Sequence, residues 1–223
     1  MKPTVCVVFD IDDTLYLERE YVQSGFGAVD EWAAKWLGIP DFAERCWCAF
    51  ESGQRQSIFD TILRQYGVQP SPGLIASLVA IYRTHVPLIS LAPDAYDAIA
   101  AIARTTSIAV ISDGPAASQT RKAEALRLST FADPVILTEL LGPDFAKPHP
   151  KAFETVQEFH PTGRYLYVAD NPLKDFAAPK QLGWLTVRVR REYGLHYSVE
   201  NSDPRPDFEI PDCSRLPDLI KQL

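Results

Sequence analysis

The sequence predicts an α/β protein built on a doubly wound parallel sheet, with a helical subdomain inserted after the first strand. Short apolar runs without polar alternation recur along the chain, which is typical of strands buried on both faces. Helical patterns separate most of these runs, as in β-α-β units. Residues 17–88 contain helical patterns only, and a chain of 223 residues is long enough for one domain with such an insertion.

Six strands are expected from the apolar runs. The first, residues 5–9, is entirely apolar and ends at Asp10. The others occupy residues 108–111, 134–137, 166–169, 185–189 and 208–210. Their short lengths and β-branched residues favour strands over helices. A polar loop with two prolines, residues 190–206, precedes the last strand.

Helical patterns fall into two groups. Between the strands, helices are expected at 93–104, 116–128, 151–159 and 173–182, with Pro93 in a first turn and Gly183 just after a last turn. In the insertion, helices are expected at 22–37, 42–51, 58–66 and 72–84. One face of the first of these carries Val22, Phe26, Val29, Ala33, Trp36 and Leu37.

These patterns divide the chain into two parts. Residues 1–16 and 89–223 are expected to form the core domain, and residues 17–88 a helical cap. Ligands of open α/β sheets bind at the carboxyl ends of the strands. An insertion directly after the first strand is therefore placed to cover a binding site.

Composition limits the class of partner and the environment. With 22 Lys+Arg and 29 Asp+Glu the net charge is −7, which argues against nucleic acid or an anionic membrane as the main partner. The four cysteines lack zinc-site spacing and are expected to be reduced and mostly buried. The sequence shows neither a signal peptide nor an apolar run long enough to span a membrane, so a cytoplasmic protein is expected.

The first candidate motif follows the strand at 5–9 and reads Asp10-Ile11-Asp12-Asp13-Thr14. Two carboxylates about 4 Å apart repel each other by about 1 kcal/mol in water and by more when partly desolvated. A hard cation such as Mg²⁺ relieves this repulsion through oxygen ligands. The alternative for this motif alone is an acidic surface loop that closes a strand.

Two further motifs could bind phosphate. Ser112-Asp113-Gly114 follows the strand at 108–111, where a hydroxyl and backbone amides at a glycine turn can hold phosphate oxygens. Lys147 precedes Pro148 at a helix entrance and supplies one positive charge. Taken singly, the first is equally an ordinary strand-to-helix turn, and the lysine a solvated surface charge.

The fourth motif, Asp170-Asn171-Pro172-Leu173-Lys174-Asp175, follows the strand at 166–169. Asp170 is expected to face the first motif across neighbouring strand tips, as a further carboxylate for the metal. Asp175 is expected in a supporting position, paired with Lys147. A helix cap followed by a first-turn acid is the alternative.

In this order, the four motifs resemble those of the haloacid dehalogenase (HAD) superfamily over nearly the whole chain, which implies a Rossmann-like core. The helical insertion resembles the C1-type cap of the phosphatase branch. Two positions depart from the usual pattern: Ala169 stands where glycine is common, and Ser112 where threonine is a frequent alternative.

The resemblance implies a role for each motif. Asp10 corresponds to the nucleophile that becomes an aspartyl-phosphate, and Asp12 to the general acid/base. Mg²⁺ would be held by Asp10, the backbone carbonyl of Asp12 and Asp170, with Asp175 and Asn171 in support. Ser112, the amide of Asp113 and Lys147 would bind phosphoryl oxygens, and Thr14 would steady the nucleophile loop.

The function implied is a Mg²⁺-dependent phosphatase of a small phosphometabolite, with sugar phosphates or nucleoside monophosphates favoured. Asp12 favours this reaction over dehalogenation, because an alkoxide leaving group needs a proton and a halide does not. A phosphomutase or phosphotransferase also keeps both acids and stays open. A non-catalytic binding module and a phosphorylated receiver are the remaining alternatives, and neither needs the full residue set.

The cap would select the substrate. Tyr16, Arg19 and Tyr21 are the candidate contacts, with Arg19 placed to meet a second anionic group. Trp32 and Trp36 are expected to pack into the cap core, with an aromatic wall over the substrate as the alternative. A capped site suits a small phosphorylated metabolite. A monomer and a homodimer are both compatible with the sequence.

Overall fold

The computed structural model describes residues 5–161 and 163–222, and it divides the chain into two compact units. One contains the chain up to Arg19 together with the chain from Ile89 onward, and the other is Glu20–Leu88. The first unit holds a six-stranded sheet whose adjacent strands are all parallel, in the order β3-β2-β1-β4-β5-β6. The strands are β1 (Cys6–Phe9), β2 (Ser107–Ser112), β3 (Val135–Leu137), β4 (Tyr165–Ala169), β5 (Leu185–Val189) and β6 (Phe208–Ile210).

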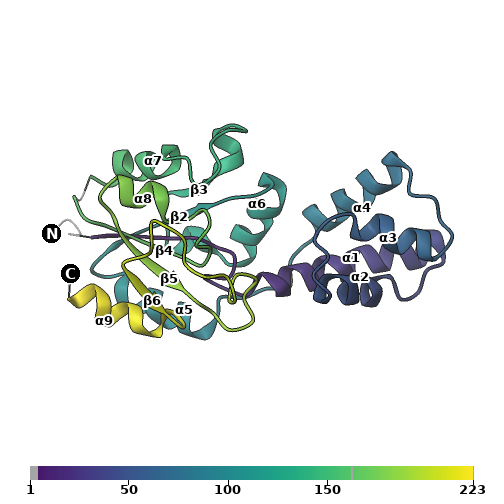
Figure 1. Ribbon diagram of the computed structural model, residues 1–223, viewed down its shortest axis with the longest axis horizontal. Helices are drawn as coiled ribbons and strands as arrows, with labels where there is room; N and C mark the ends of the chain where they lie inside the picture. The colour runs from purple at the N-terminus through teal and green to yellow at the C-terminus, as the bar shows by residue number, and fades with distance from the viewer. Residues whose placement is uncertain (1–4, 162, 223) are drawn as a thin grey trace. The chain divides into compact units, whose positions relative to one another are not determined.

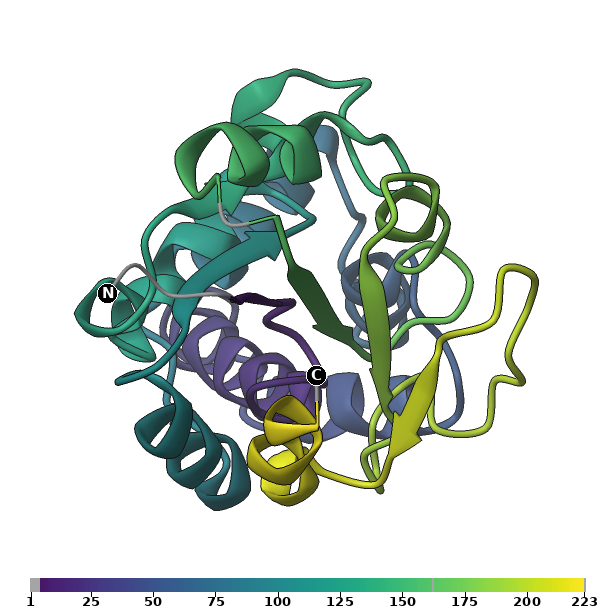
Figure 2. The ribbon, with the colours of Figure 1, turned by 90° about the vertical axis from the view of Figure 1, so that its left-hand side faces the viewer.

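Helices cover both faces of this sheet, and the predicted α/β fold is confirmed. The α-helices of the unit are α5 (Pro93–Ile102), α6 (Ala116–Ala125), α7 (Lys151–Phe159), α8 (Ala177–Gln181) and α9 (Leu216–Lys221). Helices α7 and α8 lie over one face, and α5 and α9 over the other (Figures 1 and 2). Phe153 of α7 packs edge-to-face on Tyr167 of β4 in the apolar core. Since β1 lies between β2 and β4, the carboxyl ends of these three strands are neighbours.

Helix α8 is shorter than the sequence suggests. A helix is expected at 173–182, but α8 begins only at Ala177. The Asn171 side chain accepts a hydrogen bond from the amide of Leu173 at 3.0 Å, and the Asp175 carboxylate accepts one from the amide of Asn171 at 3.0 Å. These side chains hold the backbone of the fourth motif in turns and delay the helix.

The second unit contains most of α1 (Glu18–Leu37) together with α2 (Phe42–Glu51), α3 (Ile58–Gln65) and α4 (Pro72–Thr84). Its interior is aromatic: the Phe26 ring lies 6.1 Å from that of Phe59 and 5.7 Å from that of Tyr82. The prediction that Trp36 packs into this core is wrong. Trp36 lies in the last turn of α1 and is 63% exposed, whereas Ile39, just beyond the helix end, is 3% exposed.

The cysteines are mostly buried, as the sequence predicts. Cys6, Cys46 and Cys213 are buried and Cys48 is exposed, and all four are free thiols. Among the described residues, no helix combines the length and the apolar character that a membrane span requires.

Two glycines of α1 give a matched test of packing in the helical unit. A Cβ at Gly25 would lie 2.6 Å from two ring carbons of Tyr82, whereas a Cβ at Gly27 would meet no described atom within 4 Å. Gly25→Ala is expected to lower the free energy of unfolding by about 1–3 kcal/mol through overpacking. Gly27→Ala is expected to raise it by about 0.5–1 kcal/mol through helix propensity. Urea denaturation followed by circular dichroism measures both, and a stabilising Gly25→Ala would contradict the packing described.

Candidate active site

The site is built around Lys147, whose side chain is fully buried. Its Nζ lies 2.6 Å from Oδ1 of Asp10, 2.7 Å from Oδ1 of Asp175 and 3.0 Å from the hydroxyl of Tyr167. Asp10 follows β1 directly, and its amide donates to the carbonyl of Val168 in β4. Burial alone would lower the pKa of Lys147, but the two carboxylates outweigh it and raise that pKa well above its ordinary value. Lys147 is therefore a buried cation held between two acids, and the expected pairing with Asp175 is present.

Asp113 holds the backbone of Lys147 in place. Its Oδ1 accepts hydrogen bonds from the Lys147 amide at 3.1 Å and from Oγ1 of Thr138 at 2.8 Å. Its Oδ2 pairs with Nζ of Lys174 at 2.9 Å. The Asp113 carboxylate thus joins the turn after β2 to the loop that carries the lysine, whereas the sequence assigned a role only to the Asp113 amide.

Three buried carboxylates gather beside Lys147. Oxygens of Asp10, Asp170 and Asp175 all lie within 4.8 Å of one another. Burial raises the pKa of Asp10 to about 6, against the opposing effect of Lys147, and it raises the pKa of Asp170 to about 6 as well. Clustered oxygen donors with excess negative charge suit a hard divalent cation. The residues present therefore fit the metal that the sequence implied.

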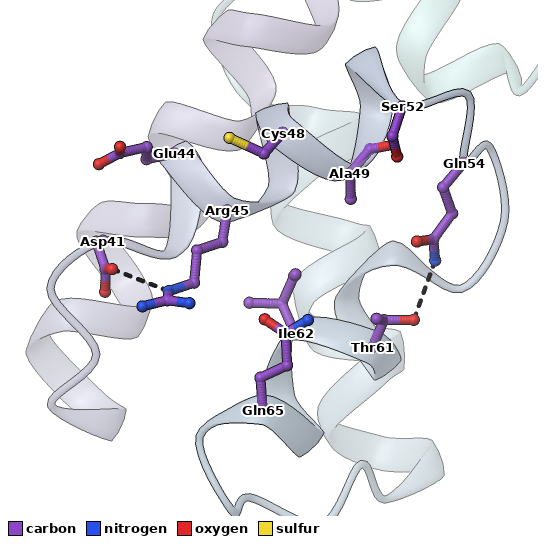
Figure 3. A pocket seen from close by; sticks show the side chains of 10 residues that line it. All are labelled: Asp41, Glu44, Arg45, Cys48, Ala49, Ser52, Gln54, Thr61, Ile62 and Gln65. Carbon is purple, nitrogen blue, oxygen red and sulfur yellow. Dashed lines mark hydrogen bonds and ion pairs between the residues drawn. The ribbon is translucent and has the colours of Figure 1, made fainter.

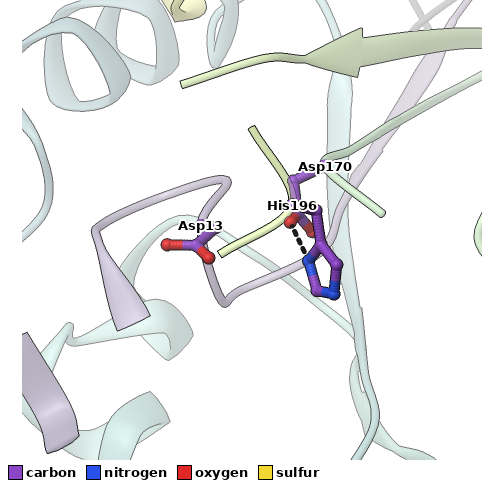
Figure 4. Close-up of side chains that lie close together, drawn as sticks. All are labelled: Asp13, Asp170 and His196. Atoms are coloured by element: carbon purple, nitrogen blue, oxygen red, sulfur yellow. Dashed lines mark hydrogen bonds and ion pairs between the residues drawn. The ribbon is translucent and has the colours of Figure 1, made fainter. Parts of the chain in front are cut away.

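A second cluster contains Asp13, Asp170 and His196 (Figure 4). Nδ1 of His196 lies 2.8 Å from Oδ2 of Asp170. Asp13 accepts the amide of Glu18 on one oxygen at 2.9 Å and the amide of Leu195 on the other at 2.6 Å. Because its oxygens already accept backbone hydrogens, Asp13 fastens the loop carrying His196 to the loop after β1. The sequence singled out neither residue for a role.

Arg188 of β5 binds the backbone of the loop that carries His196. Its side chain is fully buried and donates to the carbonyls of Asp170 at 3.1 Å, His196 at 2.8 Å and Val199 at 2.7 Å. It also donates to Oδ1 of Asn201 at 2.8 Å. A charged arginine within a predicted buried strand was the one sequence signal that could have indicated this role.

Asp12 lies in a separate set of contacts. Its Oδ1 accepts the Tyr16 hydroxyl at 2.5 Å and Nζ of Lys122 at 2.6 Å, and its Oδ2 accepts Nε2 of Gln119 at 3.0 Å. Burial alone would raise the pKa of Asp12, but the charge of Lys122 and these hydrogen bonds outweigh it and lower the pKa. Gln119 also accepts the hydroxyl of Ser112 at 2.9 Å, so α6 links the first and second motifs.

Thr14, Arg19 and Tyr21 are the remaining residues that the sequence singled out. The Thr14 hydroxyl is buried and has no hydrogen-bond partner among the described residues, while its carbonyl accepts Nη2 of Arg191 at 2.8 Å. Arg19 is the last residue of the sheet-containing unit before the boundary. Tyr21 belongs to the helical unit, where its hydroxyl donates to the carbonyl of Tyr82 at 3.2 Å.

The helical unit has a cavity of its own, of about 540 Å³, between α2 and α3 (Figure 3). It is lined by Asp41, Glu44, Arg45, Cys48, Ala49, Ser52, Gln54, Thr61, Ile62 and Gln65. None of the residues that the sequence assigned to the site lines it.

Similarity to known proteins agrees with this geometry. Residues 4–183 match the family model of the haloacid dehalogenase-like hydrolases. Two curated relatives, from Methanopyrus kandleri and Methanocaldococcus jannaschii, are 29% and 27% identical over 97% of this chain and 97% of their own. Both are named glyceraldehyde 3-phosphate phosphatase. The magnesium-bound HAD-hydrolase YfnB from Bacillus subtilis shares the fold, with a TM-score of 0.67 and 19% identity over 98% of this chain and 99% of that one. The chain belongs to the haloacid dehalogenase-like hydrolases.

Proposed function

We propose that this protein is a Mg²⁺-dependent phosphatase that hydrolyses a small sugar phosphate through an aspartyl-phosphate intermediate. The observation that carries the proposal is Asp10 at the tip of β1, paired with buried Lys147 and clustered with Asp170 and Asp175. The names of the two curated relatives favour a sugar phosphate over a nucleoside monophosphate, and a phosphatase over a mutase.

Each group of site residues has its own role in the proposed reaction. Asp10 attacks phosphorus, so that an oxygen–phosphorus bond forms to its carboxylate as the bond to the leaving oxygen breaks. Asp12 donates a proton to that leaving oxygen and then takes one from the water that hydrolyses the intermediate. Ser112, the amide of Asp113 and Lys147 bind the transferring phosphoryl oxygens.

The metal site is proposed from the same cluster. Asp10, Asp170 and the backbone carbonyl of Asp12 would hold the cation, and Asp175 and Asn171 would support it. When bound, Mg²⁺ supplies positive charge that offsets the repulsion between the phosphoryl group and the Asp10 carboxylate. His196 orients Asp170 through the contact between Nδ1 and Oδ2.

The helical segment, residues 17–88, is proposed to act as a C1-type cap over the core formed by residues 1–16 and 89–223. A cap that excludes bulk water suits a small phosphorylated metabolite. Arg19 stays the candidate contact to a second anionic group. Tyr16 also stays a candidate contact, and its buried side chain donates its hydroxyl to Asp12.

Removal of the metal tests the proposal. With Mg²⁺, phosphate release is expected from glyceraldehyde 3-phosphate and from 4-nitrophenyl phosphate, and EDTA is expected to abolish it until Mg²⁺ is restored in excess. Other sugar phosphates and nucleoside monophosphates rank the substrate, and chromatography of the products detects an isomerised sugar phosphate. Release that is indifferent to EDTA would overturn the metal assignment. An isomerised product without free phosphate would identify a mutase.

A further inference from the structure

Helix α6 supplies two side chains that hold Asp12. Nζ of Lys122 lies 2.6 Å from Oδ1 of Asp12, and Nε2 of Gln119 lies 3.0 Å from Oδ2. The two residues are three positions apart on one helix and therefore lie on the same face. Both are 3% exposed, so this face of α6 is turned into the protein.

The burial of Lys122 needs a reason beyond packing. A lysine ammonium is strongly hydrated, and removing it from water is unfavourable unless it is paired. An ion pair of equal length elsewhere is more accessible: Lys180 and Asp207 also lie 2.6 Å apart, but their side chains are 28% and 29% exposed. The Lys122 side chain is 3% exposed and that of Asp12 is 18% exposed. The Lys122 contact is thus a buried restraint on an acid that keeps partial access to solvent.

The two oxygens of Asp12 are held unequally. Oδ1 accepts both short contacts, from Tyr16 at 2.5 Å and from Lys122 at 2.6 Å, whereas among the described residues Oδ2 accepts the longer amide contact from Gln119 alone. A carboxylate oxygen has more than one acceptor direction. Oδ2 is therefore the oxygen better placed to exchange a proton, while Oδ1 is restrained.

We propose that Lys122, together with Gln119, is a positioning residue that fixes the orientation of Asp12 for proton transfer to the leaving oxygen. The proposal rests on the role of Asp12 in the proposed function. In this proposal, Lys122 acts only through Asp12 and does not contact the substrate. A general acid works only within hydrogen-bond reach of the atom it protonates, so a carboxylate free to rotate transfers its proton less efficiently.

The test compares two leaving groups. An alkoxide needs a proton as it departs, whereas 4-nitrophenolate departs without one. Lys122→Met is expected to lower kcat/KM for an alkyl phosphate by about 10-fold or more beyond its effect on 4-nitrophenyl phosphate, a fraction of the full contribution of a general acid. The ratio of kcat/KM for the two substrates is the readout, because a merely structural loss lowers both equally.

Three further variants complete the experiment. Lys180→Met removes an exposed ion pair of the same length and is expected to leave the ratio unchanged. Lys122→Arg keeps the charge and is expected to restore part of the ratio. In an Asp12→Asn background, Lys122→Met is expected to change the ratio no further. An equal loss on both substrates, or an additional loss in that background, would overturn the positioning role. If the wild-type protein hydrolysed neither the alkyl phosphate nor 4-nitrophenyl phosphate, the proposed function itself would be refuted.

Discussion

Asp10→Asn is expected to reduce phosphate release by on the order of 10⁴–10⁶-fold, the range seen when a catalytic nucleophile is removed. The amide has nearly the size of the carboxylate, so its geometry between Lys147 and Asp170 is preserved while its nucleophilicity is lost. No phosphoprotein should form with either ester. Acid-quenched mass spectrometry measures the phosphorylated fraction directly, and steady-state phosphate release measures the rate.

The matched control is the same substitution at a surface acid. Asp207→Asn removes one partner of the ion pair with Lys180, outside the carboxylate cluster, and is expected to keep near-wild-type turnover. A cooperative thermal unfolding transition is the check that each variant is folded. If Asp10→Asn were folded and kept a tenth of the wild-type rate, Asp10 would not be the nucleophile.

Asp12→Asn is expected to lower turnover of alkyl phosphates by about 10²–10⁴-fold, the usual contribution of general acid–base catalysis. Both half-reactions suffer, because the same carboxylate protonates the leaving oxygen and activates the water. With 4-nitrophenyl phosphate the first half-reaction needs no acid. The variant should therefore release one equivalent of nitrophenolate per enzyme rapidly and then stall as the phosphorylated protein.

A stopped-flow trace distinguishes this variant from the first. Asp12→Asn gives a burst of nitrophenolate and an accumulated phosphoprotein, and Asp10→Asn gives neither. If Asp12→Asn released nitrophenolate linearly at the wild-type rate, Asp12 would have no part in hydrolysis of the intermediate, and the assignment of base would have to move to another residue.

The location of the candidate site could be predicted from sequence because its motifs follow strands. Asp10, Ser112 and Asp170 come at or directly after the ends of β1, β2 and β4, and those strands are adjacent in the sheet. An apolar run shows where a buried strand ends, and parallel strands end at one edge. The pairing of Lys147 with Asp175 could be predicted because the two side chains carry opposite charges.

The supporting contacts could not be predicted in the same way. His196 reaches Asp170 from a polar loop without periodicity, and its position depends on Arg188 binding the loop carbonyls. Gln119 and Lys122 share a helical face, but a helix pattern alone does not tell which face meets the loop after β1. Side chains that bind backbone also moved the start of α8, since local hydrogen bonds there compete with helix formation.

The charge around Lys147 has a consequence for stability if the proposed cation binds there. Three carboxylates and one ammonium amount to 1 − 3 = −2 in a buried cluster. Folding without a cation must bring these two excess charges together in a poorly solvated space, so the free energy of cation binding adds to that of folding. With the proposed metal site, the folded fraction is therefore expected to rise with the free concentration of the divalent ion by mass action. Asp10→Asn lowers this excess from two charges to one and leaves Lys147 paired with Asp175, so the metal-free variant is expected to depend less on the divalent ion for its stability than the wild type does.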